Sequence, residues 1–449
     1  MMIKANVKRI DRVAIAVVIA TSVGIAAGTA RNSAITGRRS QLIENKITPL
    51  FERRPNGKKV AAGTDLQSLL DSSPAGAVFD LSPGVYSGPI VVRKPVTIQG
   101  PRSATIRSNG TGMTIDIASD DVALVGFTID GSGDRPDLTD SAVRVRGSSN
   151  VTVQAIRVVN ALFGLVAERS RNIRFVGNEI VGNASTSVGL RGDGIRLWET
   201  RDSVVERNTL VDGRDIVVWY SSDNRILNNE VRRCRYGTHL MYSDRGTIEN
   251  NLYVENVVGI FIMYSHDISI VNNVAAGNQS DGMGLGAKES GNLFVKGNSF
   301  VKDPIGIYLD GSPFRPQDSD VFEDNLFDLC DTGVVFHSSA TRNVFKGNTF
   351  RDDRTHVRVE GRGDALGVTW LGNYFDDYAG YDFDRDGIGD VPYEARSLSD
   401  RLTSDRPELE FFRGAAATTL LDALGRVFPL YQPEPTLVDP RPLIAPRKF

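Results

Sequence analysis

Short apolar stretches separated by glycine and asparagine turns set the pattern of the middle of the chain. Between residues 224 and 291 one sequence pattern occurs three times, in Arg235–Ser243, Val257–Ser265 and Ser280–Lys288. An asparagine turn separates one copy from the next, as in Ile248–Leu252. A repeat of about 22 residues that holds two short strands and a turn is typical of a solenoid.

The same alternation extends towards the N-terminus. Short strands are predicted at Ala77–Leu81, Ile90–Val92, Val96–Gln99, Ala104–Ile106 and Met113–Ile117. Tight-turn residues separate these strands. Upstream, Leu66, Leu69 and Leu70 recur at helical spacing. They predict a short N-terminal helix that caps the first coil, because the apolar core of an end coil would otherwise face water.

Asparagines mark the later coils. They fall at Asn178, Asn208, Asn229, Asn251, Asn273, Asn298, Asn325, Asn348 and Asn373. Asparagine suits corners because it tolerates a left-handed backbone and bonds to its own turn. Since short strands repeat without helices between them, we predict an all-β fold, a right-handed parallel β-helix over residues 61–375. A leucine-rich-repeat horseshoe is the alternative, but the sequence lacks the leucine spacing that it requires.

Glycines at the start of one strand in each coil predict which side chains face outward. They are Gly194, Gly237, Gly259, Gly282, Gly306 and Gly333. Alternation places the residue after each glycine in the core and the next one outside. One outward column is then Arg196, Val217, His239, Phe261, Gly284, Tyr308 and Val335, and its neighbour is Trp198, Trp219, Met241, Met263, Gly286, Asp310 and His337. Tyr220, Tyr242 and Tyr264 follow in register. Gly284 and Gly286, the predicted outward residues of one coil, predict a pocket with a bare floor.

Candidate chemistry gathers on this outward face. Met241 and Met263 are predicted to lie on adjacent coils, with His239 two residues away and His266 on the following turn. Thioether and imidazole groups suit Cu(I), and adjacent strands bring side chains to roughly 5 Å. We therefore predict these four residues as candidate ligands of a transient Cu(I) ion.

The same face is also a predicted docking surface, and the two interpretations are compatible. Exposed aromatic and methionine side chains commonly mark protein contacts. The candidate docking residues here are Trp198, Trp219, Tyr242, Phe261 and Tyr264.

The first 30 residues have the layout of a secretory signal. A basic segment precedes an apolar stretch that ends in small residues at Ala30. We predict cleavage near Ala30 and export from the cytoplasm. The alternative is an uncleaved membrane anchor, because the stretch is at the lower length limit for spanning. Residues 31–60, rich in arginine and lysine, are predicted to form an exposed mature N-terminus.

An acidic loop follows the repeats at residues 376–396. Asp382, Asp384, Asp386 and Asp390 occur in an Asp-x-Asp-x-Asp-Gly pattern, the spacing of a calcium loop. The twelfth position of this loop is Tyr393, where a calcium sensor has glutamate. We predict a structural calcium clip; the alternative is a metal-free acidic turn.

Residues 397–449 have a different pattern. Leu420, Leu421, Leu424 and Phe428 lie on or near one face of a predicted C-terminal helix. The prolines that follow predict an extended tail. The helix and the Pro-rich tail either cap the solenoid or dock on a partner.

Composition excludes one class of partner. The chain has 449 residues, 24% of them charged, and a net charge of −3. No nucleic-acid partner is expected, because such proteins normally carry a strong basic excess.

Two cysteines, Cys234 and Cys330, occupy the same place on coils that lie four apart. At ~4.8 Å per coil their separation is on the order of 19 Å, too far for a disulfide. Both are predicted to be free, mostly buried thiols.

The motifs resemble one known family, NosD, a periplasmic β-helix protein of the CASH-domain type that serves nitrous oxide reductase maturation. The resemblance rests on Arg235–Ser243, Met263–Ser265, Gly282–Lys288 and Gly372–Tyr393. It covers essentially the whole mature chain. Phe375 stands where the family commonly has tryptophan, which is a mild departure.

The resemblance implies an accessory protein and not an enzyme. It implies that the partners are the membrane and ATPase subunits of an ABC transporter, a lipoprotein copper chaperone and apo-nitrous oxide reductase, whose copper–sulfide cluster is assembled. The location implied is the periplasm, beside the inner membrane. The chain has no Gly-x-x-x-x-Gly-Lys-Ser/Thr loop, so it is not expected to hydrolyse ATP.

Two other function classes remain open. A pure protein-docking scaffold would use the outward face for contacts alone. A polysaccharide lyase or epimerase would need convergent carboxylates in a groove, and the outward columns lack clustered aspartates.

Overall fold

Three parallel sheets make up most of the described chain. The structure is a computed structural model that describes residues 54–337, 340–361, 363–396, 409, 412, 415–417, 420 and 434–447. All of these residues belong to one compact unit, Thr48–Phe449. The predicted signal segment and the side chains of Leu421, Leu424 and Phe428 lie outside the described residues.

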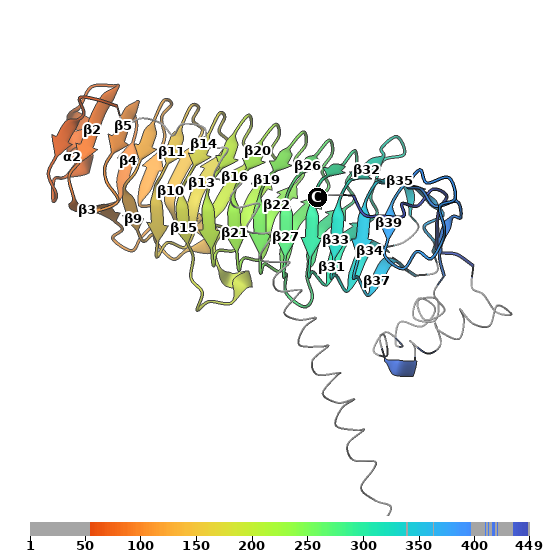
Figure 1. The fold of residues 1–449 in the computed structure, drawn as a ribbon. Helices are drawn as coiled ribbons and strands as arrows, with labels where there is room; N and C mark the ends of the chain where they lie inside the picture. Colours follow the sequence, from red (N-terminus) through yellow and green to blue (C-terminus); the bar gives the residue numbers. More distant parts are fainter. Residues whose placement is uncertain are drawn as a thin grey trace, which may run out of the picture. The chain divides into compact units, whose positions relative to one another are not determined.

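Each sheet is built from short strands stacked in sequence order (Figure 1). Sheet A consists of β1 (Lys58–Val60), β2 (Ala77–Leu81), β5 (Val96–Gln99), β8 (Ala123–Val125), β11 (Thr152–Gln154), β14 (Arg174–Val176), β17 (Val204–Glu206), β20 (Arg225–Leu227), β23 (Thr247–Glu249), β26 (Ser269–Val271), β29 (Phe294–Lys296), β32 (Asp320–Glu323), β35 (Thr341–Lys346) and β38 (Gly367–Leu371). Sheet B consists of β3 (Gly84–Ser87), β6 (Ala104–Arg107), β9 (Thr128–Asp130), β12 (Arg157–Val159), β15 (Glu179–Val181), β18 (Thr209–Val211), β21 (Glu230–Arg232), β24 (Leu252–Val254), β27 (Val274–Ala276), β30 (Ser299–Val301), β33 (Leu326–Asp328), β36 (Thr349–Arg351) and β39 (Tyr374–Phe375). Sheet C consists of β4 (Ile90–Val92), β7 (Ile115–Ile117), β10 (Ser141–Arg146), β13 (Phe163–Glu168), β16 (Ile195–Trp198), β19 (Asp215–Trp219), β22 (Tyr236–Met241), β25 (Val258–Met263), β28 (Met283–Lys288), β31 (Ile305–Asp310), β34 (Thr332–His337) and β37 (Thr355–Glu360).

Most coils contribute one strand to each sheet, so the predicted parallel β-helix is confirmed. The prediction of two strands per repeat is wrong, because the repeat holds three. Strands β20 and β21 are each three residues long and flank the corner at Asn228 and Asn229. That segment was predicted to be an asparagine turn between two short strands.

Inward side chains of the three sheets form one continuous core. Alternation predicted this correctly: Ile260 and Ile262 of β25 are 1% and 0% exposed, whereas Phe261 between them is half-buried on the outside. Cys234 and Cys330 are both free and buried in this core, as predicted.

The corner between sheets A and B carries a ladder of buried asparagines. Asn251 Oδ1 accepts a hydrogen bond of 2.8 Å from Asn229 N, and Asn251 Nδ2 donates to Asn273 Oδ1 at 2.9 Å. Asn251 Nδ2 also donates to the backbone oxygen of Ile226 at 2.8 Å. Each asparagine therefore satisfies backbone groups that the turn leaves unpaired, as buried polar groups require.

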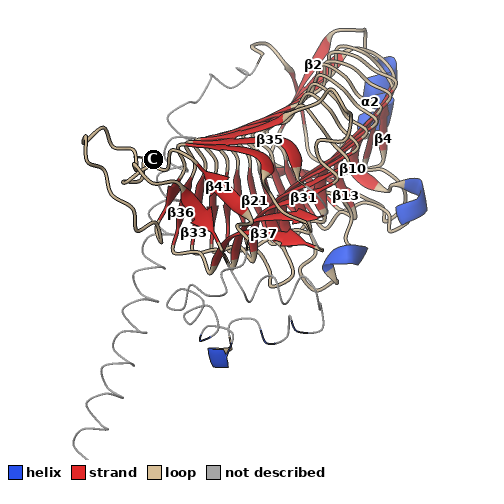
Figure 2. Ribbon diagram, turned by 90° about the vertical axis from the view of Figure 1, so that its right-hand side faces the viewer, coloured by secondary structure: helices blue, strands red, loops and turns tan. Residues whose placement is uncertain are grey.

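A short helix covers the first coils, as predicted. Helix α2 (Leu66–Ser72) begins after Asp65, whose side chain accepts a hydrogen bond from Ser68 N. Leu66 and Leu70 are buried against the core. Figure 2 shows this helix beside the strands of the first coils, near β2 and β4.

The last coil is covered by a segment from far along the sequence. Strand β40 (Tyr393–Ala395) pairs antiparallel with β41 (Leu437–Asp439). Asp439 Oδ2 accepts hydrogen bonds of 2.9 Å from both N and Nδ2 of Asn373, the last member of the ladder.

Two short 3₁₀ helices, η1 (Pro136–Leu138) and η2 (Val188–Leu190), lie in longer loops. None of the helices within the described ranges has the length and hydropathy of a membrane span.

Candidate functional site

Met241 and Met263 lie side by side on the outer face of sheet C. They end strands β22 and β25 and are register partners, as are His239 and Phe261 two residues earlier. Both methionines are half-buried. Because neighbouring strands lie about 4.8 Å apart, their thioethers are within reach of a single ion.

His239 is covered by aromatic rings. His239 is only 5% exposed. The centroid of its ring lies 5.3 Å from that of Trp219, 5.0 Å from that of Tyr236 and 5.9 Å from that of Phe261. Val217, its neighbour in the column, is fully buried. The prediction that this column faces solvent is therefore wrong for both residues, because large side chains from flanking rows fold over it.

The imidazole of His239 has unsatisfied nitrogens. Neither ring nitrogen has a hydrogen-bond partner among the described residues. Nδ1 lies 3.7 Å from Asp215 Oδ2, beyond hydrogen-bonding distance. Buried polar atoms are normally paired, so Nε2 is a free ligand position two residues from Met241.

Asp215 gives this side of the face a fixed negative charge. It is completely buried and forms an ion pair with Arg235. Burial opposes ionisation, but the nearby His239 and Arg235 side chains outweigh it and lower the pKa of Asp215. A carboxylate on the Nδ1 side favours the tautomer with the proton there, which leaves the Nε2 lone pair for a metal.

The coil that contains β28 differs from the predicted register. Phe261 pairs with Gly286, and Met263 pairs with Lys288, so Gly286 and Lys288, not Gly284 and Gly286, hold the outward positions. A Cβ on Gly286 would lie 2.7 Å from Met283 Sδ and 2.7 Å from Phe261 Cδ2. The predicted bare-floored pocket is wrong, since these two side chains cover the glycine.

His266 lies at the corner beyond β25. Its Nε2 is 3.4 Å from Asp318 Oδ2, and its Nδ1 is 3.8 Å from Asp244 Oδ1. Its backbone N donates to Asp244 Oδ1 at 2.8 Å. The structure therefore brings His239, Met241 and Met263 to one face and holds His266 between carboxylates.

The predicted docking residues form stacked aromatic rows. Tyr220, Tyr242 and Tyr264 stack with centroid separations of 5.3 and 4.9 Å and interplanar angles of 12° and 15°. Trp198 and Trp219 are 5.6 Å apart in the neighbouring row. Tyr220 and Tyr242 are exposed, so this row is available to a partner.

The acidic loop holds three of its four candidate calcium ligands together. Carboxylate oxygens of Asp382, Asp384 and Asp386 lie within 4.8 Å of one another, whereas Asp390 Oδ2 accepts a hydrogen bond from Phe383 N. Backbone N–H groups of the loop donate to these aspartates, including Gly387 N to Asp382 Oδ2 at 3.0 Å. The calcium assignment stays a prediction.

Two residues that sequence reasoning did not single out contribute to candidate sites, Asp215 and His356, and a third, Met283, covers Gly286. The sequence signal that pointed to Asp215 is a charged residue at the first position of a strand, β19. Met283 was assigned inward by the wrong register, and the partners of His356 lie one coil later in the sequence.

Comparison with known proteins finds similarity to one family. A family model described as "Periplasmic copper-binding protein (NosD)" matches residues 176–380. Two curated relatives named "Probable ABC transporter binding protein NosD" extend the match. The Stutzerimonas stutzeri protein is 26% identical over 81% of this chain and 86% of its own length. The Pseudomonas aeruginosa protein is 25% identical over 82% of this chain and 88% of its own length.

The chain is thus similar to NosD proteins in its central coils and, at about a quarter identity, over most of its length. The resemblance stated from the motifs is therefore confirmed. The description of that family is a periplasmic copper-binding protein.

Solved structures resemble the chain in fold. The A-module of a mannuronan C-5 epimerase from Azotobacter vinelandii has a TM-score of 0.52 and 15% identity, and the match covers 69% of this chain and 96% of that module. Identity at this level shows the β-helix fold alone and carries no activity over to this chain.

Proposed function

We propose that this chain is a periplasmic accessory protein that holds Cu(I) transiently for the assembly of the copper–sulfide cluster of nitrous oxide reductase. Copper is cargo in this role. Its partners would be an ABC transporter, a lipoprotein copper chaperone and the apo-enzyme. The family description as copper-binding and the names of the relatives support the copper and the transporter.

One observation carries the copper assignment to particular residues. Met241 and Met263 are register partners, and His239 beside them has a buried Nε2 without a hydrogen-bond partner in the described part of the chain. Two thioethers and one imidazole are soft to borderline donors that match Cu(I) better than harder divalent ions. Aromatic cover around His239 would keep water from the bound ion.

The proposed ligands are weak and partly open, which suits transfer. Thioethers are neutral and bind without losing a proton, and the charge of Asp215 is offset by Arg235, so no uncompensated negative charge would hold the cation. Half-buried methionines leave one side of the ion accessible to a chaperone or to the reductase. His266 is a candidate for a neighbouring position on the transfer path because it follows Met263 by three residues.

The test is Cu(I) affinity in the periplasmic chain under anaerobic, reducing conditions, measured by competition with a chromophoric Cu(I) chelator. The double variant Met241→Leu/Met263→Leu keeps side-chain volume and removes both sulfurs. We expect its affinity to fall by at least about tenfold. Met113→Leu, a half-buried methionine on another coil, is the matched control and should bind as the wild type does. Unchanged binding by the double variant would remove copper from this face.

A docking scaffold is the second candidate function, favoured by the stacked tyrosines. Tyr242 is 49% exposed between Tyr220 and Tyr264, and such ordered aromatic rows are suited to protein contacts because little side-chain entropy remains to be lost. If docking alone is the role, Tyr242→Ser abolishes partner capture and chelation has no effect. The copper role predicts capture that depends on the loaded metal.

A further inference from the structure

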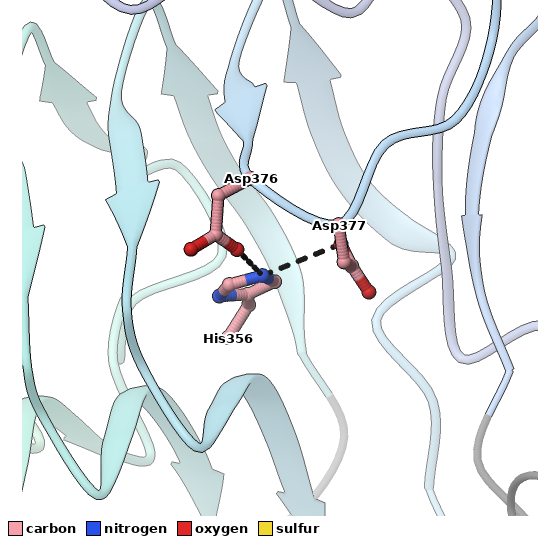
Figure 3. A group of neighbouring side chains, drawn as sticks. All are labelled: His356, Asp376 and Asp377. Atoms are coloured by element: carbon pink, nitrogen blue, oxygen red, sulfur yellow. Dashed lines mark ion pairs between the residues drawn. The ribbon is translucent and has the colours of Figure 1, made fainter. Parts of the chain in front are cut away.

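A second cluster of metal-binding side chains lies at the last coil, away from the methionines in sequence. Figure 3 shows His356 of β37 between Asp376 and Asp377, which directly follow β39. His356 Nε2 is 3.1 Å from Asp376 Oδ1 and 3.3 Å from Asp377 Oδ1. The three donor atoms all lie within 4.8 Å of one another.

The imidazole is held from both sides. Its side chain is 10% exposed and packs against the rings of Phe350 and Phe375 at 5.8 and 5.7 Å. These rings belong to the stack that fills the core of the final coils. The ring of His356 therefore has little freedom, and its Nε2 edge is presented to the two carboxylates.

Behind the imidazole ring lies a fully buried carboxylate, Asp353, with one oxygen that has no hydrogen-bond partner among the described residues. The side chain of Asp353 is 0% exposed, and its Oδ2 is 3.7 Å from His356 Nδ1. Oδ1 of Asp353 accepts a hydrogen bond from Cys330 N at 2.8 Å. Neither Asp353 Oδ2 nor His356 Nδ1 has a hydrogen-bond partner among the described residues. A carboxylate behind the Nδ1 of a ligating histidine is the arrangement that orients imidazoles at metal sites.

The separations fit coordination to one ion. Zn²⁺ binds imidazole nitrogen and carboxylate oxygen at about 2.0–2.2 Å, so two donors on one ion are about 2.8–3.6 Å apart, depending on geometry. Both measured distances from His356 Nε2 fall in this range. The same distances suit a protonated imidazole, so a proton and a metal would compete for Nε2.

We propose that His356, Asp376 and Asp377 bind a divalent first-row transition-metal ion such as Zn²⁺, with Asp353 positioning the imidazole. One nitrogen and two carboxylate oxygens are harder donors than the thioethers of the methionine pair, so this site rejects Cu(I). The ion ties β37 to the chain that leaves the last coil and enters the acidic loop. The proposal does not depend on the copper role of the outer face of sheet C.

The test is stoichiometric Zn²⁺ binding by the full mature chain, stripped of metal and titrated against a chromophoric chelator. The wild type is expected to take up one Zn²⁺ that Asp376→Asn/Asp377→Asn does not bind. Asp353→Asn, which changes only the group behind the ring, should weaken binding about 10–100-fold. Co²⁺ in place of Zn²⁺ should give visible absorption bands that disappear with His356→Gln.

His337→Gln is the matched control. His337 Nδ1 pairs with a single carboxylate, Glu360, at 2.9 Å, so its replacement should leave Zn²⁺ uptake unchanged. Far-ultraviolet circular dichroism shows whether each variant retains the β-helix. The proposal is overturned if the folded wild type binds no Zn²⁺; His356 is then a protonated imidazole paired with the two carboxylates. It is also overturned if the double asparagine variant still binds Zn²⁺. Cu(I) affinity should be the same in all these variants, which separates this test from that of the methionine pair.

Discussion

At the scale of single residues, the stacking of coils places the side chains of one repeat position in a column. The position of Cys234 repeats in Asn256, Asn278 and Asp303 on successive coils. Asn256 Oδ1 accepts from Cys234 N at 2.8 Å, and Asp303 Oδ1 accepts from Asn278 N at 3.1 Å. Asn256, Asn278 and Asp303 thus each satisfy a backbone N–H of the coil before them.

Asp303 is the member of this column with a titratable side chain and an unpaired oxygen. It is 1% exposed, and its Oδ2 has no hydrogen-bond partner within the described ranges. Burial raises the pKa of Asp303 to about 7, from 3.8. The folded state therefore keeps a proton that the unfolded state has already lost between about pH 4 and 7. Stability falls as the pH rises through this window and is lowest above pH 7.

We expect Asp303→Asn to remove this penalty. An amide is neutral at every pH and keeps the accepting oxygen, and Asn256 shows that its Nδ2 finds a backbone carbonyl, that of Val231, at 3.1 Å. At about 1.4 kcal/mol per pKa unit, the gain at pH 8 is on the order of a few kcal/mol. The melting temperature should rise by several degrees at pH 8 and change little at pH 4.

The control for Asp303→Asn is Asp281→Asn, an exposed position that should leave both melting temperatures unchanged. Buried Asp320 has its pKa raised to about 7 by burial as well, so some pH dependence should remain in the variant. A melting temperature that is no higher than that of the wild type at pH 8 would contradict the assignment.

At the scale of strands, the sequence predicted the parity of the core in most coils, because alternation alone decides it, and it predicted the strands of the first coils. The predicted ranges of β2, β4 and β5 match the structure. The register of β28 was wrong because Gly282, Gly284 and Gly286 alternate, and all fit a repeat glycine. Packing decides between them: a Cβ on Gly284 would lie 2.4 Å from Phe300 Cδ1, so only this glycine can occupy the crowded inner position.

Sites were harder to predict than strands because their residues come from different coils. His356 and Asp376 are 20 residues apart, and no spacing pattern connects them until the coils stack. The methionine pair was predictable because both members recur at one repeat position. The burial of His239 was not, since it depends on how Trp219, Tyr236 and Phe261 fold over the sheet.

In the acidic loop, backbone N–H groups donate hydrogen bonds to aspartate side chains and so close the turns. The loop is also predicted to bind calcium. Asp384 Oδ1 accepts from Asp386 N at 3.2 Å, and Asp386 Oδ1 accepts from Ile388 N at 2.7 Å. Asparagine at both positions keeps these bonds and removes two charges. Without a glutamate at the twelfth position, binding should need millimolar Ca²⁺.

We expect the melting temperature of the wild type to rise with millimolar Ca²⁺, and that of Asp384→Asn/Asp386→Asn to stay constant. Mg²⁺ at the same ionic strength is the control, because it fits flexible oxygen cages poorly. If calorimetry finds the same melting temperature with Ca²⁺ and with Mg²⁺ in the wild type, the loop is a metal-free turn.

At the scale of the solenoid, stability depends on how the end coils are closed. Each coil of a solenoid contacts only the coils next to it. An uncovered end coil therefore exposes both apolar core side chains and backbone groups without a hydrogen-bond partner. At the C-terminal end, Tyr393 stacks on Phe375 at 3.9 Å, continuing the column of core phenylalanines. Leu437 is fully buried beside it. The sequence predicted an Asp-rich loop and a tail there, but not that their strands pair.

Asp439 completes the asparagine ladder at this end, and its replacement should open the last coil selectively. Its Oδ2 accepts from both N and Nδ2 of Asn373, and its Oδ1 accepts from Gly372 N at 3.3 Å. Asp439→Ala leaves these buried donors unpaired, at a cost of about 1–3 kcal/mol for each group. Asp439→Asn is the matched control, because asparagine fills every earlier position of the ladder and retains an accepting oxygen. Hydrogen exchange measured by mass spectrometry should show faster exchange in β36 and β39 of the alanine variant, with the middle coils unchanged. Exchange that accelerates equally along the whole solenoid, or an asparagine variant as open as the alanine variant, would show that Asp439 does not act as the end of the ladder.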